Sequence, residues 1–384
     1  MNKWARDLLS LKKLLCGLPK KIGMRPEEYA DFFKMVPKMR RYLRHDGLKW
    51  VSPFFRPDCI LTDTGPKVLE FNIDTGSMAF ISGISLKLLY SIVPGLPEYL
   101  THDLKTGFDK SFWAEDIFTA YLKNIGKKKR NLYLWDIKDR DSEGTKERSF
   151  EIDYFRDKGV KIELLVAGDI LTKLSPEAYC FRYFAYLHFF TPSSALENLF
   201  LNIPSGLIDK NDISISSLLY DNKINLALLW DPRIQKYLDP GERALVSEYI
   251  PETYLSSEVS KDFIRRALKD KDLWVIKKGI GRQGKNVHIG RDYSSHDWRT
   301  IVMEAVEAKD YVFQKLVKAT TLPSELTDGK NMFTASGGHI LNFHYVNNTF
   351  GGMLFRATCR KTGSKIGAID SSEVAGVMPL ILDF

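Results

Sequence analysis

The stretch RPDCILTDTGPKVLEFN, residues 56–72, decides the fold, because it joins two short apolar runs through a turn sequence. Gly-Pro beside clustered Asp and Thr predicts a β-hairpin. Asp58 and Glu70 are twelve residues apart, so the hairpin brings their carboxylates together at one end of a sheet. Side chains alternate along a strand, so Arg56 shares the face of Asp58, and Asn72 shares the face of Glu70. Two carboxylates and an amide oxygen are hard donors that suit Mg²⁺.

Each of these residues has a simpler interpretation when it is taken alone. Asp58 is then a turn residue and Glu70 a solvated strand residue. The alternation continues through Asn72 to Asp74, which gives one strand face three polar side chains and requires a solvated or metal-bound surface. A phosphate-binding region elsewhere in the chain would favour the metal site.

A second motif, WVIKKGIGRQGKNVHIG at residues 274–290, supplies that region. A short apolar strand leads into a glycine-rich loop, and a second strand follows. Glycines let backbone N–H groups approach phosphate oxygens closely, and neighbouring cations add charge. No helix opens after the glycines, so the motif is neither a P-loop nor a dinucleotide fingerprint. The alternative is a loop that merely turns. The glycines are Gly279, Gly281 and Gly284, and the cations are Lys277, Lys278, Arg282 and Lys285.

A third segment, residues 311–317, is an aromatic and β-branched strand that follows an amphipathic helix at 296–308. Such a strand is typical of an ordinary core. After a phosphate-binding flap it could instead offer backbone groups and Gln314 to the edge of an adenine.

In their order along the chain, these motifs resemble the ATP-grasp enzymes, specifically the circularly permuted branch that includes glutathionylspermidine synthase. In that branch an Arg-x-Asp motif and then Glu-x-Asn precede the nucleotide-binding half. The middle segments (IPSGLIDKNDISISSLLYDNKINLALLWD and LDPGERALVSEYIPETYLSS) and the stretch GGMLFRAT keep the same order. The resemblance covers residues 50–360. It implies an α+β or α/β class, with an ATP-grasp fold in circularly permuted order and a small doubly wound lobe.

The resemblance also implies ATP and Mg²⁺ as cofactors and a role for each motif residue. The metal ligands would be Asp58, Glu70 and Asn72. The lysines would hold the α- and β-phosphates under the glycine loop, and the 311–317 strand would line the adenine. These nucleotide-binding residues are Lys223, Lys277, Gly279, Gly281, Arg282, Gly284, Gln314, Leu316 and Val317. Arg56 would contact the γ-phosphate, and Arg356 would complete the phosphate or acyl-phosphate site. The family's substrate residues have no match here, which leaves the substrate open.

Length and patterning predict three parts. A chain of 384 residues exceeds one compact core. Residues 1–125 carry N-terminal helices and the metal-bearing hairpin, residues 126–205 a small α/β lobe, and residues 206–384 the nucleotide-binding half. In the lobe, Gly159 follows a periodic segment and predicts a helix end. The further elements are helices at 84–92, 112–122 and 148–157 and strands at 131–136 and 160–165.

Composition indicates an ordinary globular protein without a membrane span. Hydrophobic residues make up 44% and charged residues 27%, and no apolar run reaches eighteen residues. The four cysteines (Cys16, Cys59, Cys180 and Cys359) show no pairing or metal spacing, which suits a reducing cytoplasm.

The net charge is +8, and the densest basic run is KNIGKKKR at residues 123–130, in an expected loop between a helix and a strand. A solubilising loop is one interpretation, and docking of an acidic partner such as a carrier protein is another. No RNA-binding fingerprint is present, which argues against a nucleic-acid partner.

These expectations combine into an ATP- and Mg-dependent carboxylate–amine or carboxylate–thiol ligase that works through an acyl phosphate. The expected substrate is an amino acid or small peptide, positioned by residues 74–77. A special case is natural-product biosynthesis with a carrier-protein acceptor. Two alternatives stay open, a nucleotide-binding protein without ligase activity and a small-molecule kinase.

Overall fold

The computed structural model describes most of the chain, and the statements below concern those parts. They are residues 3–33, 52–73, 114–136, 143–182, 202–203, 207, 217–281, 286–320, 324–327, 332–335, 339–358 and 374–379. The expected helix at 84–92 and the substrate loop at 74–77 lie outside them, as do Arg282 and Gly284.

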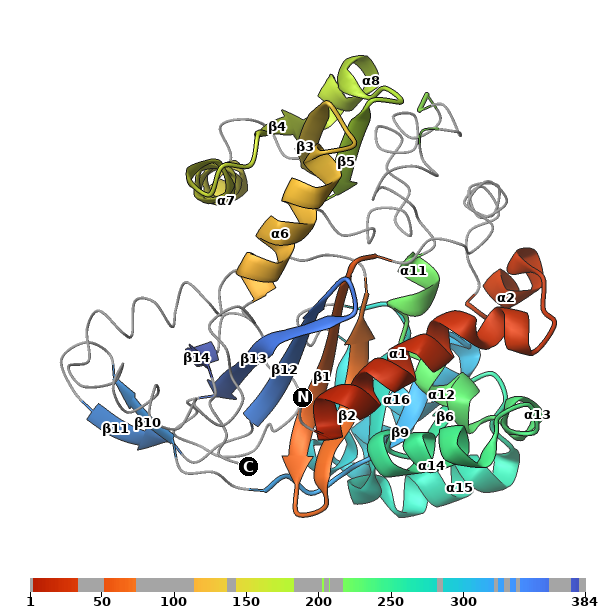
Figure 1. Cartoon of the computed structure of the whole chain (residues 1–384). Helices are drawn as coiled ribbons and strands as arrows, with labels where there is room; N and C mark the ends of the chain where they lie inside the picture. Colours follow the sequence, from red (N-terminus) through yellow and green to blue (C-terminus); the bar gives the residue numbers. More distant parts are fainter. Residues whose placement is uncertain are drawn as a thin grey trace.

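A five-stranded antiparallel sheet forms the centre of the molecule (Figure 1). Its order is β14-β13-β12-β1-β2, with β1 at Phe54–Thr62, β2 at Gly65–Asn72, β12 at His339–Val346, β13 at Thr349–Thr358 and β14 at Val374–Pro379. The expected hairpin is confirmed: Gly65 has a φ of +108°, and the Thr62 hydroxyl donates to its carbonyl oxygen at 2.8 Å. Strands from both ends of the chain therefore share one sheet.

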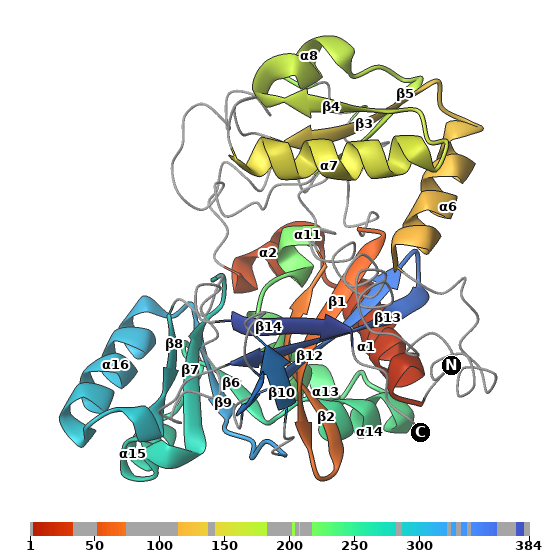
Figure 2. The same cartoon turned by 90° about the vertical axis from the view of Figure 1, so that its left-hand side faces the viewer.

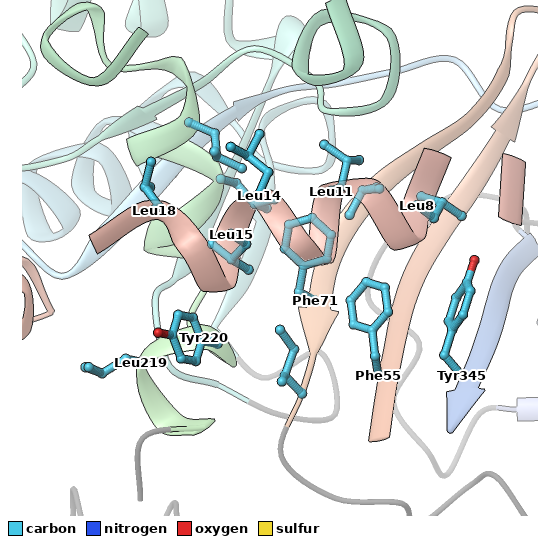
Figure 3. Close-up of a cluster of buried hydrophobic side chains, with 14 of the residues drawn as sticks. Leu8, Leu11, Leu14, Leu15, Leu18, Phe55, Phe71, Leu219, Tyr220 and Tyr345 are labelled. Carbon is cyan, nitrogen blue, oxygen red and sulfur yellow. The ribbon is translucent and has the colours of Figure 1, made fainter. Parts of the chain in front are cut away.

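Helix α1, Lys3–Lys21, covers one face of this sheet. Its buried leucines recur every three or four residues, which gives one apolar stripe. In Figure 3 the stripe packs on Phe55, Phe71 and Tyr345. Because side chains alternate, the neighbouring positions of β1 and β2 point to the opposite face, which carries the polar residues. The short helix α2, Pro26–Phe32, follows α1. The stripe consists of Leu8, Leu11, Leu15 and Leu18.

A small lobe holds three parallel strands in the order β4-β3-β5 and stands at the top of Figure 2. Its elements are α6 (Ala114–Gly126), β3 (Asn131–Asp136), α7 (Glu143–Asp157), β4 (Ile162–Val166), a 3₁₀ turn (Ala167–Asp169), α8 (Ile170–Lys173) and β5 (Ala178–Arg182). Phe118 of α6 contacts both Phe54 of the central sheet, at 4.6 Å between ring centroids, and Phe181 of the lobe, at 5.1 Å. Helix α6 thus links the two sheets.

The sequence-based boundaries of this lobe need three corrections. Helix α7 begins at Glu143 rather than 148, and β4 begins at Ile162 rather than 160. Helix α6 continues to Gly126, so the start of the basic run belongs to a helix end and not to a loop. The helix stop is confirmed, because Gly159 has a φ of +79°.

The third part is built on a four-stranded sheet in the order β6-β9-β7-β8. Its strands are β6 (Thr253–Leu255), β7 (Trp274–Lys278), β8 (Val287–Ile289) and β9 (Tyr311–Lys315). Helices α15 (Lys261–Lys269) and α16 (Ser295–Ala308) pack on this sheet (Figure 2). Phe263 of α15 and Trp298 of α16 lie in one apolar cluster with Phe313 of β9. The two strands of the expected flap and the helix at 296–308 are confirmed, but β9 ends at Lys315, so Leu316 and Val317 lie beyond the strand.

Shorter elements complete the described structure. Helices α11 (Ser217–Tyr220), α12 (Ile224–Trp230), α13 (Pro232–Gln235) and α14 (Pro240–Tyr249) precede β6. The 3₁₀ turns Lys271–Leu273 and Gly290–Asp292 flank β7 and β8, and β10 (Ser324–Thr327) pairs with β11 (Met332–Ala335). The result is a mixed α/β fold, as expected. No helix in the described residues is long and apolar enough to span a membrane.

Candidate functional site

The β1–β2 hairpin sets two carboxylates side by side. Asp58 pairs with Glu70 across the strands, and Arg56 pairs with Asn72, so all four positions share one face. Arg56 donates from Nε to Asp58 Oδ1 at 2.7 Å and from Nη2 to Oδ2 at 3.2 Å. Asn72 Nδ2 donates to the Arg56 carbonyl oxygen at 3.2 Å, which fixes which end of the amide is the nitrogen. The metal and phosphate residues expected in this motif therefore do meet.

A lysine from the third part of the chain reaches the hairpin. Lys223 Nζ lies 2.7 Å from Glu70 Oε2 and donates to the Gly281 carbonyl oxygen at 3.0 Å. The backbone N–H of Lys223, just before helix α12, also donates to the Gly279 carbonyl oxygen at 2.9 Å. The lysine thus ties the glycine loop to the acidic hairpin.

Lys277, at the end of the flap strand β7, is the second lysine and is only 6% exposed. Its Nζ donates to Gln314 Oε1 at 2.7 Å and to the Leu69 carbonyl oxygen at 3.2 Å. Gln314 Nε2 in turn donates to Thr253 Oγ1 at 3.2 Å. Both ends of the Gln314 amide are therefore bonded within the protein. The residue holds Lys277 in place, and its expected contact with an adenine stays a prediction.

The charges of this cluster change the pKa values of its members. Burial would raise the pKa of Glu70, but Lys223, with Lys277 and Arg56 nearby, lowers it to about 2. Burial lowers the pKa of Lys277 to about 8, although Glu70 opposes that change. Burial also acts to lower the pKa of Arg56, but Asp58 outweighs it and raises that pKa. Three cationic side chains face Asp58 and Glu70, and Asp221 also acts to raise the pKa of Arg56, so the three cations are matched by three carboxylates.

Gly279 sits where the flap loop touches helix α12. A Cβ added there would lie 2.8 Å from Asn222 Oδ1, 2.9 Å from Ile224 Cγ1 and 3.0 Å from the Asp310 carbonyl oxygen. The backbone N–H of Gly279 also donates to that Asp310 oxygen at 2.7 Å. The first glycine of the motif is therefore required for close packing of the loop.

We expect Gly279→Ala to lower the free energy of unfolding by about 2 kcal/mol, because an overpacked site must shift its neighbours. Chemical denaturation measures the change. The matched control is Gly17→Ala in helix α1, where nothing lies within 4 Å of the added Cβ and a gain of about 0.5 kcal/mol is expected. Equal effects of the two changes would contradict the close packing.

Fewer contacts define the positions of the remaining predicted residues, Arg356, Leu316 and Val317. Arg356 lies in β13 opposite Ile340 of β12 and Val377 of β14. Leu316 and Val317 follow β9, and the Leu316 N–H donates to the Leu273 carbonyl oxygen at 2.8 Å. Asn222 packs against the loop at Gly279, and Thr253 accepts a hydrogen bond from Gln314. Both residues lie in the middle segments that carry the resemblance, as parts of an Asn-Lys pair and an Ile-Pro-x-Thr turn, but no site role was predicted for either.

The donor set fits a hard divalent cation chemically. Asp58 and Glu70 offer carboxylate oxygens, and Asn72 has its nitrogen end held by Arg56, which turns its carbonyl oxygen away from that contact. The described residues contain no cluster of three or more His, Cys, Asp or Glu side chains, so the fit rests on two carboxylates and one amide. Both carboxylates are ion-paired in the free protein, so a cation would exchange with Arg56 and Lys223.

No protein-family model matches the sequence, and no curated protein matches it. Among solved structures, the chain is similar to a glutathione synthetase-like effector from Globodera pallida in its apo form. The TM-score is 0.56 at 12% identity over 97% of this chain and 82% of the other. A protein provisionally assigned as a gamma-glutamylcysteine synthetase from Methylobacillus flagellatus KT gives a TM-score of 0.42 at 10% identity over 99% of this chain and 88% of that one. The first likeness shows that the chain has a glutathione synthetase-like fold.

Proposed function

We propose that the protein is an ATP- and Mg-dependent ligase that joins a carboxylate to an amine or thiol. The observation that carries the proposal is the meeting of Asp58 and Glu70 with three cations beneath a glycine-rich hairpin. A cluster of that composition is suited to a metal-bound polyphosphate. The glutathione synthetase-like fold supports it. In this proposal the fold is an ATP-grasp in circularly permuted order, similar to the glutathionylspermidine synthase branch.

The cations would bind the triphosphate by exchanging partners. Lys223 now contacts Glu70, and Arg56 contacts Asp58. A bound triphosphate would take over these cations, and the carboxylates would be released toward Mg²⁺. Lys277 is held between Gln314 and Leu69, so it is already oriented at the base of the flap. Such an exchange keeps every buried charge compensated, which limits the desolvation cost.

Asp58, Glu70 and Asn72 would hold the Mg²⁺. When bound there, the ion would offset the charge that develops on the transferred phosphoryl group. Arg56 would contact the same group from its neighbouring position on β1, opposite Asn72.

The proposed reaction has two steps. A carboxylate oxygen of the substrate attacks the γ-phosphorus, the bond to the bridging oxygen breaks, and ADP leaves with that electron pair. An amine or thiol then attacks the acyl carbon, loses its proton and expels phosphate. Arg356 and the flap N–H groups would stabilise the oxyanion of this second step. Closure of the glycine loop would keep water from the acyl phosphate.

The substrate class in this proposal is an amino acid or a small peptide. With a carrier protein as the acceptor, the basic run at the end of α6 would provide a complementary surface. Residues 206–384 would bind the nucleotide, and residues 1–125 would supply the metal ligands.

Hydroxylamine trapping tests the proposal without knowledge of the acceptor. The protein is incubated with Mg-ATP, hydroxylamine and a panel of amino acids, and both ADP and hydroxamate are measured. We expect hydroxamate and ADP in equal amounts with one of the acids. ADP without hydroxamate would support the kinase alternative. Neither product, with nucleotide still bound, would support a nucleotide-binding protein without ligase activity.

A further inference from the structure

The polar face of the central sheet continues beyond the predicted motif onto β12. Asn342 pairs directly with Asp58 across β1 and β12, so the two side chains lie on the same face. Its neighbours Leu341 and Phe343 belong to the opposite, apolar face that packs under α1. Asn342 is therefore the next side chain in a row that already contains Glu70 and Asp58.

Asn342 is fully buried, with 0% exposure, yet its amide makes no internal hydrogen bond. Neither Oδ1 nor Nδ2 has a partner within the described part of the chain. Asn225 is equally buried and shows the usual arrangement. Its Nδ2 donates to the Leu219 carbonyl oxygen at 2.6 Å, and its Oδ1 accepts from the Tyr29 hydroxyl at 2.9 Å. A buried amide without any partner is uncommon in folded proteins and costs free energy.

Packing alone does not account for an amide at this position. A leucine has nearly the same shape and would carry no desolvation cost. The position is enclosed to nearly the same degree as that of Asp58, which is 3% exposed and belongs to the proposed metal site. An unpartnered donor and acceptor beside Asp58 therefore match a ligand that offers both an acceptor and a donor.

We propose that Asn342 is a further binding residue for the metal-bound triphosphate, an inference that rests on the proposed function. Its Nδ2 donates to a phosphate oxygen, and its Oδ1 accepts from a water molecule of the bound cation. Asp58 and Asn342 thus contact the ligand from adjacent strands. The free protein leaves the amide unsatisfied, and the bound ligand satisfies it.

Asn342→Leu separates this role from a structural one. Thermal unfolding of the free protein and binding of a Mg-bound, non-hydrolysable ATP analogue are measured on the wild type and the variant. We expect the melting temperature of the free variant to rise by about 2 °C, because an unsatisfied polar group is removed. We expect the affinity for the analogue to fall about tenfold, because two hydrogen bonds to the ligand are lost.

Unchanged affinity in Asn342→Leu would overturn the proposal, whatever the melting temperature does. Asn342→Ala serves as the second variant, because it cannot overpack the site, and the same affinity criterion applies to it. A wild type that does not bind the analogue would overturn the proposed function itself, and the role of Asn342 with it. If the wild type binds the analogue and both variants bind it with the same affinity, the proposed function stands and only the role of Asn342 is refuted.

Discussion

Glu70→Gln is expected to reduce kcat/KM by about 10³-fold, because the change removes a carboxylate from the metal and the partner of Lys223. The variant should remain folded. It should lose about 2 kcal/mol of the free energy of unfolding, because the buried Lys223 keeps its charge without its carboxylate. Steady-state release of ADP and chemical denaturation measure the two effects.

The stability difference between wild type and Glu70→Gln should depend on pH. The folded-state pKa of Glu70 is about 2, below its ordinary value of 4.5. A lowered carboxyl pKa contributes stability that is fully present above 4.5 and is lost as the pH falls toward 2. We therefore expect a constant difference above pH 5 and a vanishing one near pH 2.

Glu304→Gln on the exposed face of α16 is the matched control and should change neither activity nor stability. Near-normal turnover in Glu70→Gln would contradict the metal assignment. A pH-independent loss of stability would instead contradict the ion pair with Lys223.

Lys277→Met is expected to weaken binding of Mg-bound nucleotide about 100-fold, because an oriented cation at the base of the flap is lost. The free protein should change in stability by no more than about 1 kcal/mol. Burial already disfavours the charge, as the lowered pKa of about 8 indicates, and methionine fills a similar volume. The variant also loses the hydrogen bonds that Lys277 donates to Gln314 and to the Leu69 carbonyl oxygen, which offsets the removal of the buried charge.

The same lysine makes nucleotide binding depend on pH. Below pH 8 Lys277 carries its charge, and above pH 8 it loses the proton, so the affinity of the wild type should fall as the pH rises through that value. The Lys277→Met variant should show no such fall. Titration calorimetry between pH 7 and pH 9.5 measures both curves.

Lys278→Met is the control for this prediction, because Lys278 is the next residue but half-exposed, 3.7 Å from Asp310. It should leave both the affinity and its pH dependence nearly unchanged. Identical effects of the two methionine variants would mean that general positive charge, and not the position of Lys277, decides binding.

The sequence predicted those features that depend on local patterning. Alternating side chains and a turn sequence between Asp58 and Glu70 predicted the hairpin, and the glycines at 279–284 predicted the flap. The register shift between Asp58 and Cys59, which sets Asp58 opposite Glu70, was not predicted. A regular apolar period defined α16 to within one residue. These signals lie within a few residues of one another, so no tertiary information was needed.

Long-range pairing could not be predicted in the same way. No local sequence pattern predicts that β12 pairs with β1. The position of Asn342 opposite Asp58 therefore follows only from the observed strand order. Gln314 had two open interpretations, and its bonds to Lys277 and Thr253 come from three separate strands. The start of α7 was missed because the polar run at 143–147 carries no apolar period.

Binding of a non-hydrolysable ATP analogue, titrated by calorimetry with Mg²⁺ and again with excess EDTA, shows whether the cluster around Asp58 and Glu70 binds a metal-bound nucleotide. It requires no knowledge of the substrate. We predict a dissociation constant on the order of 10 μM with Mg²⁺ and an affinity at least about tenfold weaker without it, because the two carboxylates then repel the phosphates. Equal affinity in both titrations, or no binding at millimolar analogue, would contradict the account.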